Sequence, residues 1–94
     1  MIALSPEAVS DIERVRDFLG GSNEEAAKRA LRVIFAALEV LLEFPDLGRP
    51  TEEPDVRQLI IPFGAAAYVA RYTILAGTGD VLVLRLWHGR EART

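Results

Sequence analysis

The feature that most constrains the fold is a nearly unbroken apolar run close to the C-terminus, Val81–Trp87. A run of this length, bounded by turn residues and rich in branched side chains, favours a buried β-strand over a helix. A buried strand needs neighbours, so the chain must form a sheet that its last segment completes. Arg85 interrupts the run, and His88, the only histidine of the chain, follows it. These two residues are the first candidates for chemistry or binding.

Two further strand-like runs precede this one, at Val56–Ile61 and Ala66–Leu75. Short segments with glycine separate the three runs, at 62–64 and 76–80, and this spacing is typical of β-hairpins. The second half of the chain therefore predicts an antiparallel meander.

The first half predicts two helices joined by a short linker. Ser5 followed by Pro6 is a helix-start signal, and Gly20-Gly21 ends the first helix. Residues 22–25, Ser-Asn-Glu-Glu, have the spacing of a capping box for a second helix that runs to about Phe44, before Pro45. The apolar stripe of the first helix comprises Ala8, Ile12, Val15 and Leu19, and Asp11, Glu13, Arg14 and Asp17 are expected on its other side.

These elements predict an α+β fold, in which an N-terminal helical hairpin packs on one face of an antiparallel β-sheet. The expected order is a short β-strand at residues 1–4, then α, α, β, β, β. With 94 residues the chain forms a single domain, 1–94. The N-terminus lacks the pattern of a signal peptide and no run is long enough to cross a membrane. Since cysteine is absent, we expect a cytoplasmic protein without disulfides. No ligand spacing supports a metal site, and we expect no cofactor.

The charge is unevenly distributed along the chain. The net charge is −3, which argues against a surface devoted to nucleic acid. Most carboxylates precede residue 55, and arginines outnumber them after it. The sequence therefore predicts a basic patch on an acidic body.

Hairpin geometry predicts where the arginines of the strands lie. With the second hairpin centred on Thr78, Arg71 opposes Arg85, and with the first centred on Gly64, Arg57 opposes Arg71. The three arginines would form a row across one face of the sheet, and like charges in adjacent strands call for a counter-anion. The same face would carry Leu59, Ile61, Val69, Thr73, Val81, Val83 and Trp87, and the face toward the helices Tyr68, Ala70, Tyr72, Ile74, Leu82, Leu84 and Leu86.

Each of these residues also has a plainer interpretation. The arginines can lie along an exposed face, each paired with a local aspartate or glutamate. A lone histidine after a tryptophan is commonly a packed or capping residue, although His88 would titrate near neutrality and could exchange protons. Tyr68, Tyr72 and Trp87 are typical packing residues of a sheet.

Five segments together resemble the RelE/ParE superfamily, the toxins of bacterial type II toxin–antitoxin modules. The resemblance covers nearly the whole chain. It lies in the helical hairpin followed by Phe-Pro-Asp-Leu-Gly-Arg-Pro at 44–50, Val-Arg-Gln-Leu at 56–59, Tyr-Val-Ala-Arg-Tyr at 68–72 and Leu-Arg-Leu-Trp-His-Gly-Arg-Glu at 84–91.

The resemblance implies a growth-inhibiting toxin that a cognate antitoxin binds and neutralises as a hetero-oligomer. Antitoxins of such modules wrap the toxin with a segment that is often acidic, so the antitoxin would contact Arg57, Arg71, Arg85, Arg90 and Trp87. ParE-like members poison DNA gyrase, whereas RelE-like members cleave mRNA in the ribosomal A site. A degenerate toxin that only binds its antitoxin and helps to repress their promoter is a third alternative.

In a RelE-like nuclease, Arg71 would match an active-site arginine, and His88 and Arg90 would lie near the position of the general acid or base. Arg71 and Arg85 would stabilise the phosphate charge while His88 moves the proton. The chain departs from that pattern, because no lysine follows Lys28 and glycine, not tyrosine, follows His88. These departures favour a ParE-like toxin without bond-making chemistry.

Overall fold

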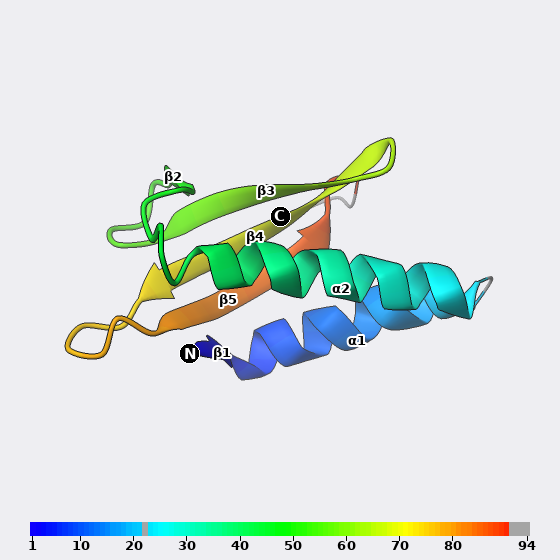
Figure 1. The fold of residues 1–94 in the computed structure, drawn as a ribbon, viewed down its shortest axis with the longest axis horizontal. Coiled ribbons are helices and arrows are strands. Elements are labelled where there is room, and N and C mark those ends of the chain that lie inside the picture. The colour runs from blue at the N-terminus through cyan, green and yellow to red at the C-terminus, as the bar shows by residue number, and fades with distance from the viewer. Residues whose placement is uncertain (22, 91–94) are drawn as a thin grey trace.

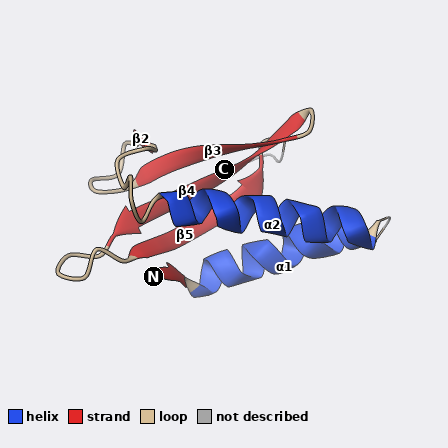
Figure 2. Ribbon diagram, in the orientation of Figure 1, coloured by secondary structure: helices blue, strands red, loops and turns tan. Residues whose placement is uncertain are grey.

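The computed structural model describes residues 1–21 and 23–90 and contains two helices and one sheet (Figure 1). The helices lie side by side and cover one face of the sheet (Figure 2). The predicted α+β architecture, with its short N-terminal strand, is confirmed. The elements are β1 (Ile2–Leu4), α1 (Pro6–Gly20), α2 (Glu24–Val40), β2 (Arg49–Pro50), β3 (Arg57–Phe63), β4 (Ala66–Ile74) and β5 (Val81–His88).

Side-chain caps set the start of both helices. The Ser5 hydroxyl accepts a hydrogen bond from the Ala8 N–H at 3.0 Å, as the Ser-Pro start signal predicts. Asn23 caps α2 by accepting from the Ala26 N–H at 3.1 Å, while Ser22 of the predicted capping box lies outside the described residues. The prediction for the end of α2 was wrong, because the regular helix ends at Val40 and a turn continues to Phe44.

The sheet is mixed, with strand order β1-β5-β4-β3-β2. The predicted meander of β3, β4 and β5 is antiparallel and confirmed. β1, in contrast, pairs parallel with β5 over Val81–Val83; both helices and strands β2, β3 and β4 lie between the two strands in the sequence. The two-residue β2 forms in the segment after α2 and extends the other edge.

The core lies between the helices and the sheet. The helices contribute small and aliphatic residues, and the sheet adds two tyrosines, Tyr68 and Tyr72, that are buried almost completely. Burying these side chains removes apolar surface from water, which is the main stabilising term of so small a domain. The core cluster comprises Ala8, Val15, Ala30, Ile34, Leu38, Leu41, Leu59, Ile61, Tyr68, Ala70, Tyr72, Val81, Val83 and Leu86.

The predicted register of β4 and β5 is confirmed at Arg71, which lies opposite Arg85. The predicted register of β3 and β4 was wrong by one residue. Arg57 lies opposite Tyr72, and Gln58 opposes Arg71. The reason is the turn, which consists of the two residues between Phe63 and Ala66 and begins with Gly64 at φ 60°. Arg57 therefore does not belong to a row of arginines, and only Arg71 and Arg85 lie opposite each other on adjacent strands.

A β-bulge in β5 makes the faces of several residues differ from the prediction. The register of β5 shifts at Leu84, since Arg71 opposes Arg85 but Tyr72 opposes Val83. The shift turns Val81 and Val83 toward the helices, where both are buried, and turns Leu82 away. The one-residue error in β3 likewise moves Leu59 and Ile61 to the helix side. Tyr68, Ala70, Tyr72 and Leu86 face the helices as predicted, and Val69, Arg71, Thr73, Arg85 and Trp87 share the other face.

Candidate functional site

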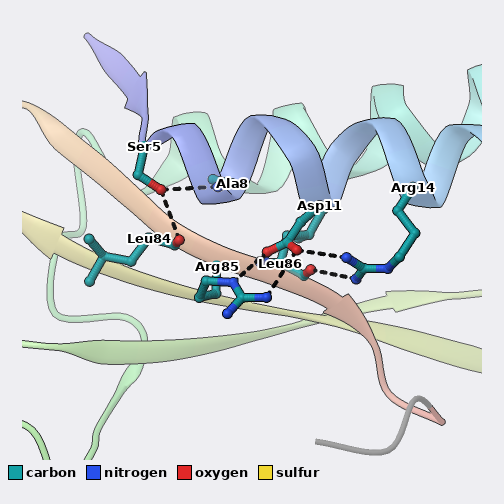
Figure 3. Close-up of polar contacts among 7 residues, drawn as sticks. All are labelled: Ser5, Ala8, Asp11, Arg14, Leu84, Arg85 and Leu86. Carbon is teal, nitrogen blue, oxygen red and sulfur yellow. Dashed lines mark hydrogen bonds and ion pairs between the residues drawn. The ribbon is translucent and has the colours of Figure 1, made fainter.

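A dense polar cluster centres on Asp11 of α1 (Figure 3). This side chain was expected on the exposed side of α1, but Asp11 is only 2% exposed. Its Oδ2 accepts from the Arg85 Nε at 2.8 Å and from the Leu86 N–H at 2.9 Å. Its Oδ1 accepts from Arg14 at 2.7 Å and from the other arm of Arg85 at 3.1 Å. Arg85 thus has its counter-anion inside the protein.

The cluster exists because part of β5 lacks a strand neighbour on the side of β1. β1 pairs only with Val81–Val83, so the backbone of β5 beyond Val83 faces α1 instead. Side chains of α1 and its cap supply the missing hydrogen bonds, as the Ser5 hydroxyl donates to the Leu84 carbonyl at 2.9 Å and Arg14 donates to the Leu86 carbonyl at 3.2 Å. Together with Asp11 these side chains seal the edge of β5.

The electrostatics of Asp11 follow from these contacts. Burial alone would raise the pKa of its carboxyl, but the hydrogen bonds from Arg85, from the Leu86 N–H and from Arg14 outweigh burial and lower the pKa to about 2. The carboxylate is therefore charged at any physiological pH, and its position indicates a structural role.

Arg71 lies on the face of the sheet away from the helices. Its Nε donates to the Gln58 Oε1 at 3.2 Å, and its guanidinium lies 5.7 Å from the centre of the Trp87 ring. The exposed carboxylates of Glu52 and Glu53 approach it at 3.5 and 3.8 Å. Arg71, like Arg85, has carboxylate partners within the chain, although the partner of Arg85 is buried and distant in sequence. The two glutamate contacts are long and solvent-exposed, so they are weak and exchangeable.

Arg57 points to the segment between α2 and β3. It donates to the Gly48 carbonyl at 2.7 Å and forms an ion pair with Asp46 at 3.5 Å. Tyr72 holds the same segment from the core side, since its hydroxyl donates to the Pro45 carbonyl at 2.7 Å and accepts from the Gly48 N–H at 2.9 Å. Tyr72 and Arg57 therefore clamp residues 44–50 against the sheet, and these contacts give the segment a structural role.

His88 lies at the end of β5, on the helix side. Its ring contacts Tyr68 edge-on at 5.3 Å between centroids, and its Nδ1 accepts from the Arg90 N–H at 3.0 Å. A groove of about 510 Å³ lies beside it, with a largely apolar lining and arginines at its rim. Phe18, 76% exposed, is the most prominent apolar residue there. The lining residues are Arg14, Val15, Phe18, Tyr68, His88 and Arg90.

The structure does not bring the predicted catalytic residues together. His88 lies opposite Tyr68, so it faces the helices, whereas Arg71 and Arg85 lie opposite each other three residues away along each strand. Because side chains alternate along a strand and no bulge intervenes, an offset of three residues makes the His88 side chain leave the sheet on the opposite face from those of Arg71 and Arg85. The Arg85 guanidinium then bonds to Asp11 of α1, whereas Arg71 stays on the face away from the helices. Trp87 shares the face of Arg71, and Arg90 shares the groove of His88.

The described residues include no group of three histidine, cysteine or acidic side chains that could hold a metal ion. Neither α1 nor α2, over the same residues, is long and apolar enough to cross a membrane.

Comparison with known proteins gives one family for this architecture. The profile of a family described as "ParE toxin of type II toxin-antitoxin system, parDE" matches residues 2–93. Toxin RelE1 of Caulobacter vibrioides is 39% identical over 98% of this chain and 96% of its own length. Toxin RelE3 of the same organism is 33% identical over 98% of this chain and 97% of its own length.

Solved structures share the fold. The chromosomal ParDE system of P. aeruginosa contains a chain that aligns with a TM-score of 0.75 at 21% identity, covering 93% of this chain and 92% of that one. The intact E. coli RelBE toxin–antitoxin complex aligns at 0.57 and 17% identity, covering 97% and 98%. The isolated E. coli RelE toxin aligns at 0.58 and 16% identity, covering 99% and 87%.

Proposed function

Because the chain belongs to the ParE toxin family of type II toxin–antitoxin systems, we propose that it inhibits growth in the cytoplasm by acting on DNA gyrase. The single observation that carries the choice of target is the separation of His88 from Arg71 on opposite faces of the sheet. A phosphoryl-transfer site needs its proton donor and its charge-stabilising groups around one phosphate. A gyrase inhibitor needs no such convergence, because it acts through surface contacts.

The pairing of the arginines supports the same choice. Arg85 is bound to the buried Asp11, and Arg71 is balanced by Glu52 and Glu53. A phosphate at Arg85 would have to displace the buried Asp11 carboxylate, whereas the exposed glutamates at Arg71 are exchangeable. At Arg85 that displacement would also leave the Leu86 N–H without its acceptor, which disfavours a catalytic role for this arginine.

A cognate antitoxin would use two cationic places. Its carboxylates would replace Glu52 and Glu53 at Arg71, where the present ion pairs are weak and Trp87 offers a ring to pack against. A second stretch of the antitoxin, apolar and flanked by an acidic residue, would enter the groove between Phe18 and Arg90. Arg57 and Arg85 would contribute long-range attraction, because both already hold internal partners.

The second candidate function is ribosome-dependent mRNA cleavage. The name RelE carried by the two Caulobacter relatives favours it. In that case Arg71 would stabilise charge, and His88 or Arg90 would have to reach the same phosphate after a rearrangement of the strand end. A toxin that is inactive and only binds its antitoxin would affect neither target.

Two assays on the purified protein separate these functions. We expect the toxin to inhibit gyrase supercoiling and to trap cleaved DNA, at concentrations that leave cell-free translation of a reporter unaffected. The antitoxin should reverse the inhibition. Translation arrest with cuts inside codons and unimpaired gyrase would reverse the order of the two candidates, and inactivity in both assays would indicate the antitoxin-binding role alone.

A further inference from the structure

The outward side of α2 carries a second, unpartnered seam. On the side opposite to the buried residues of α2, Val33 and Val40 are 37% and 44% exposed, and Ala36 between them is exposed as well. With Arg29 before them and Glu43 after them, these residues recur in steps of four, three, four and three. That alternation is the spacing of a coiled-coil seam. We call Arg29, Val33, Ala36, Val40 and Glu43 the outer seam; its last residue lies in the turn that continues α2.

The charges along this side oppose what an isolated helix favours. Arg29 and Arg32 lie one turn apart up to the centre of α2, and Glu39 and Glu43 lie one turn apart at its C-terminal end and in the turn that follows. Like charges at these spacings repel, and acids at the C-terminal end meet the negative pole of the helix dipole. Across residues 1–21 and 23–90 no opposite charge pairs with any of the four. The pattern calls for compensation from outside the chain.

We propose that a second copy of this chain packs its α2 antiparallel against the outer seam, around a two-fold axis at Ala36. Arg29 and Glu43 lie seven positions before and after Ala36, so each faces the other residue in the second copy. At 100° per residue, Val33 and Val40 lie on one side of Ala36 and Arg32 and Glu39 on the other. Around the axis Val33 therefore meets Val40, and Arg32 meets Glu39.

The same geometry selects a second copy over other occupants. An acidic antitoxin segment would suit Arg29 and Arg32 but would be repelled by Glu39 and Glu43. A copy of α2 running antiparallel presents acids to the arginines and arginines to the acids at both ends. The small side chain of Ala36 allows the two helices to approach closely. Since stable interfaces bury about 1,200–2,000 Å², a pair of single helices forms a weak dimer, populated at micromolar concentrations and above.

Charge exchange tests the proposed pairing. The full-length toxin, separated from its antitoxin under denaturing conditions and refolded, would be followed by sedimentation from about 1 to 300 µM. We expect a concentration-dependent dimer. Arg32→Glu and Glu39→Arg should each weaken dimerisation about tenfold, because symmetry makes each change act twice. The double variant R32E/E39R should restore the affinity to within about threefold of the original, because the pair is re-formed in reverse.

A matched control and a second readout keep the test decisive. Arg16→Glu, an exposed arginine of α1 outside the seam, should leave dimerisation unchanged, and circular dichroism should show each variant folded. A monomer at every concentration, or single changes whose effects the double variant fails to rescue, would overturn the proposal. A third outcome would overturn it as well: the toxin alone is monomeric, and hydrogen exchange of the toxin–antitoxin complex shows that the antitoxin protects the outer seam. The gyrase and translation assays do not depend on this outcome.

Discussion

Replacing Asp11 with alanine is expected to lower the free energy of unfolding by about 3 kcal/mol, because it leaves the buried Leu86 N–H without an acceptor and removes the charged partner of Arg85. The loss is large for a domain of this size, whose total stability is about 5–15 kcal/mol. The midpoint of urea denaturation measures it. Asp11→Asn, which keeps one oxygen acceptor, should fall between the original protein and the alanine variant.

The control for this change is Glu13→Ala on the exposed side of the same helix, which should stay within about 0.5 kcal/mol of the original. If Asp11→Ala also stays within that range, the seal on β5 contributes nothing to stability. The pH dependence gives a second reading. The pKa of Asp11 is about 2 in the folded protein and near 3.8 when unfolded, so the unfolded state binds the proton first. The contribution, about 2 kcal/mol, should be complete above pH 5 and be lost as the pH falls through 2, and Asp11→Ala should lack it.

Gly48→Ala is expected to destabilise the protein by about 3 kcal/mol, because the clamp around residues 44–50 has no room for a methyl group. A Cβ at this position would lie 2.7 Å from the Cε1 and Oη atoms of Tyr72 and 2.9 Å from the Gln58 carbonyl oxygen. Neither neighbour can yield easily. Gln58 contributes backbone within a paired strand, and the Tyr72 ring is fully buried with its hydroxyl bound to Pro45 and Gly48.

Gly21→Ala is the matched control for the glycine change. Its Cβ would lie 3.4 Å from the nearest atom, and its φ of −60° suits alanine, so the variant should be neutral or more stable by up to about 1 kcal/mol. Thermal or urea unfolding of both variants decides the matter. A stability of Gly48→Ala equal to that of Gly21→Ala would contradict the clamp.

The sequence predicted the architecture because its hydrophobic periods and turn residues are local signals. Ser5-Pro6 marked the start of α1, and the apolar run at 81–87 marked the strand that completes the sheet. Features that depend on one residue more or less were not predictable in this way. The two-residue turn at Gly64 moved Arg57 out of line with Arg71, and the bulge at Leu84 reversed the faces of Val81 and Val83. In both cases a shift of one residue changes the strand register, and the register is decided by which side chains become buried.

The site was predictable only in its residue types. Arg85 was recognised as a charge within an apolar strand, but its partner Asp11 lies 74 positions away and was assigned to the wrong side of α1. A signal did exist, since Asp11 falls three residues after Ala8 and four before Val15, both of which are buried. An acid at such a position on an apolar stripe indicates a buried ion pair, because an unpaired buried carboxylate is too unfavourable to persist.

His88→Ala gives the most direct test of a toxin that acts on gyrase and not through a nuclease site. Expressed without antitoxin, the variant is expected to arrest growth as the original does and to accumulate cleaved DNA–gyrase complexes, because the His88 ring faces the helices and Arg71 faces away from them. Mapping of gyrase-linked DNA breaks and of mRNA ends in the same cells measures both outcomes. Messenger RNA cut within codons by the original toxin, and left intact by a folded His88→Ala variant that no longer arrests growth, would contradict it.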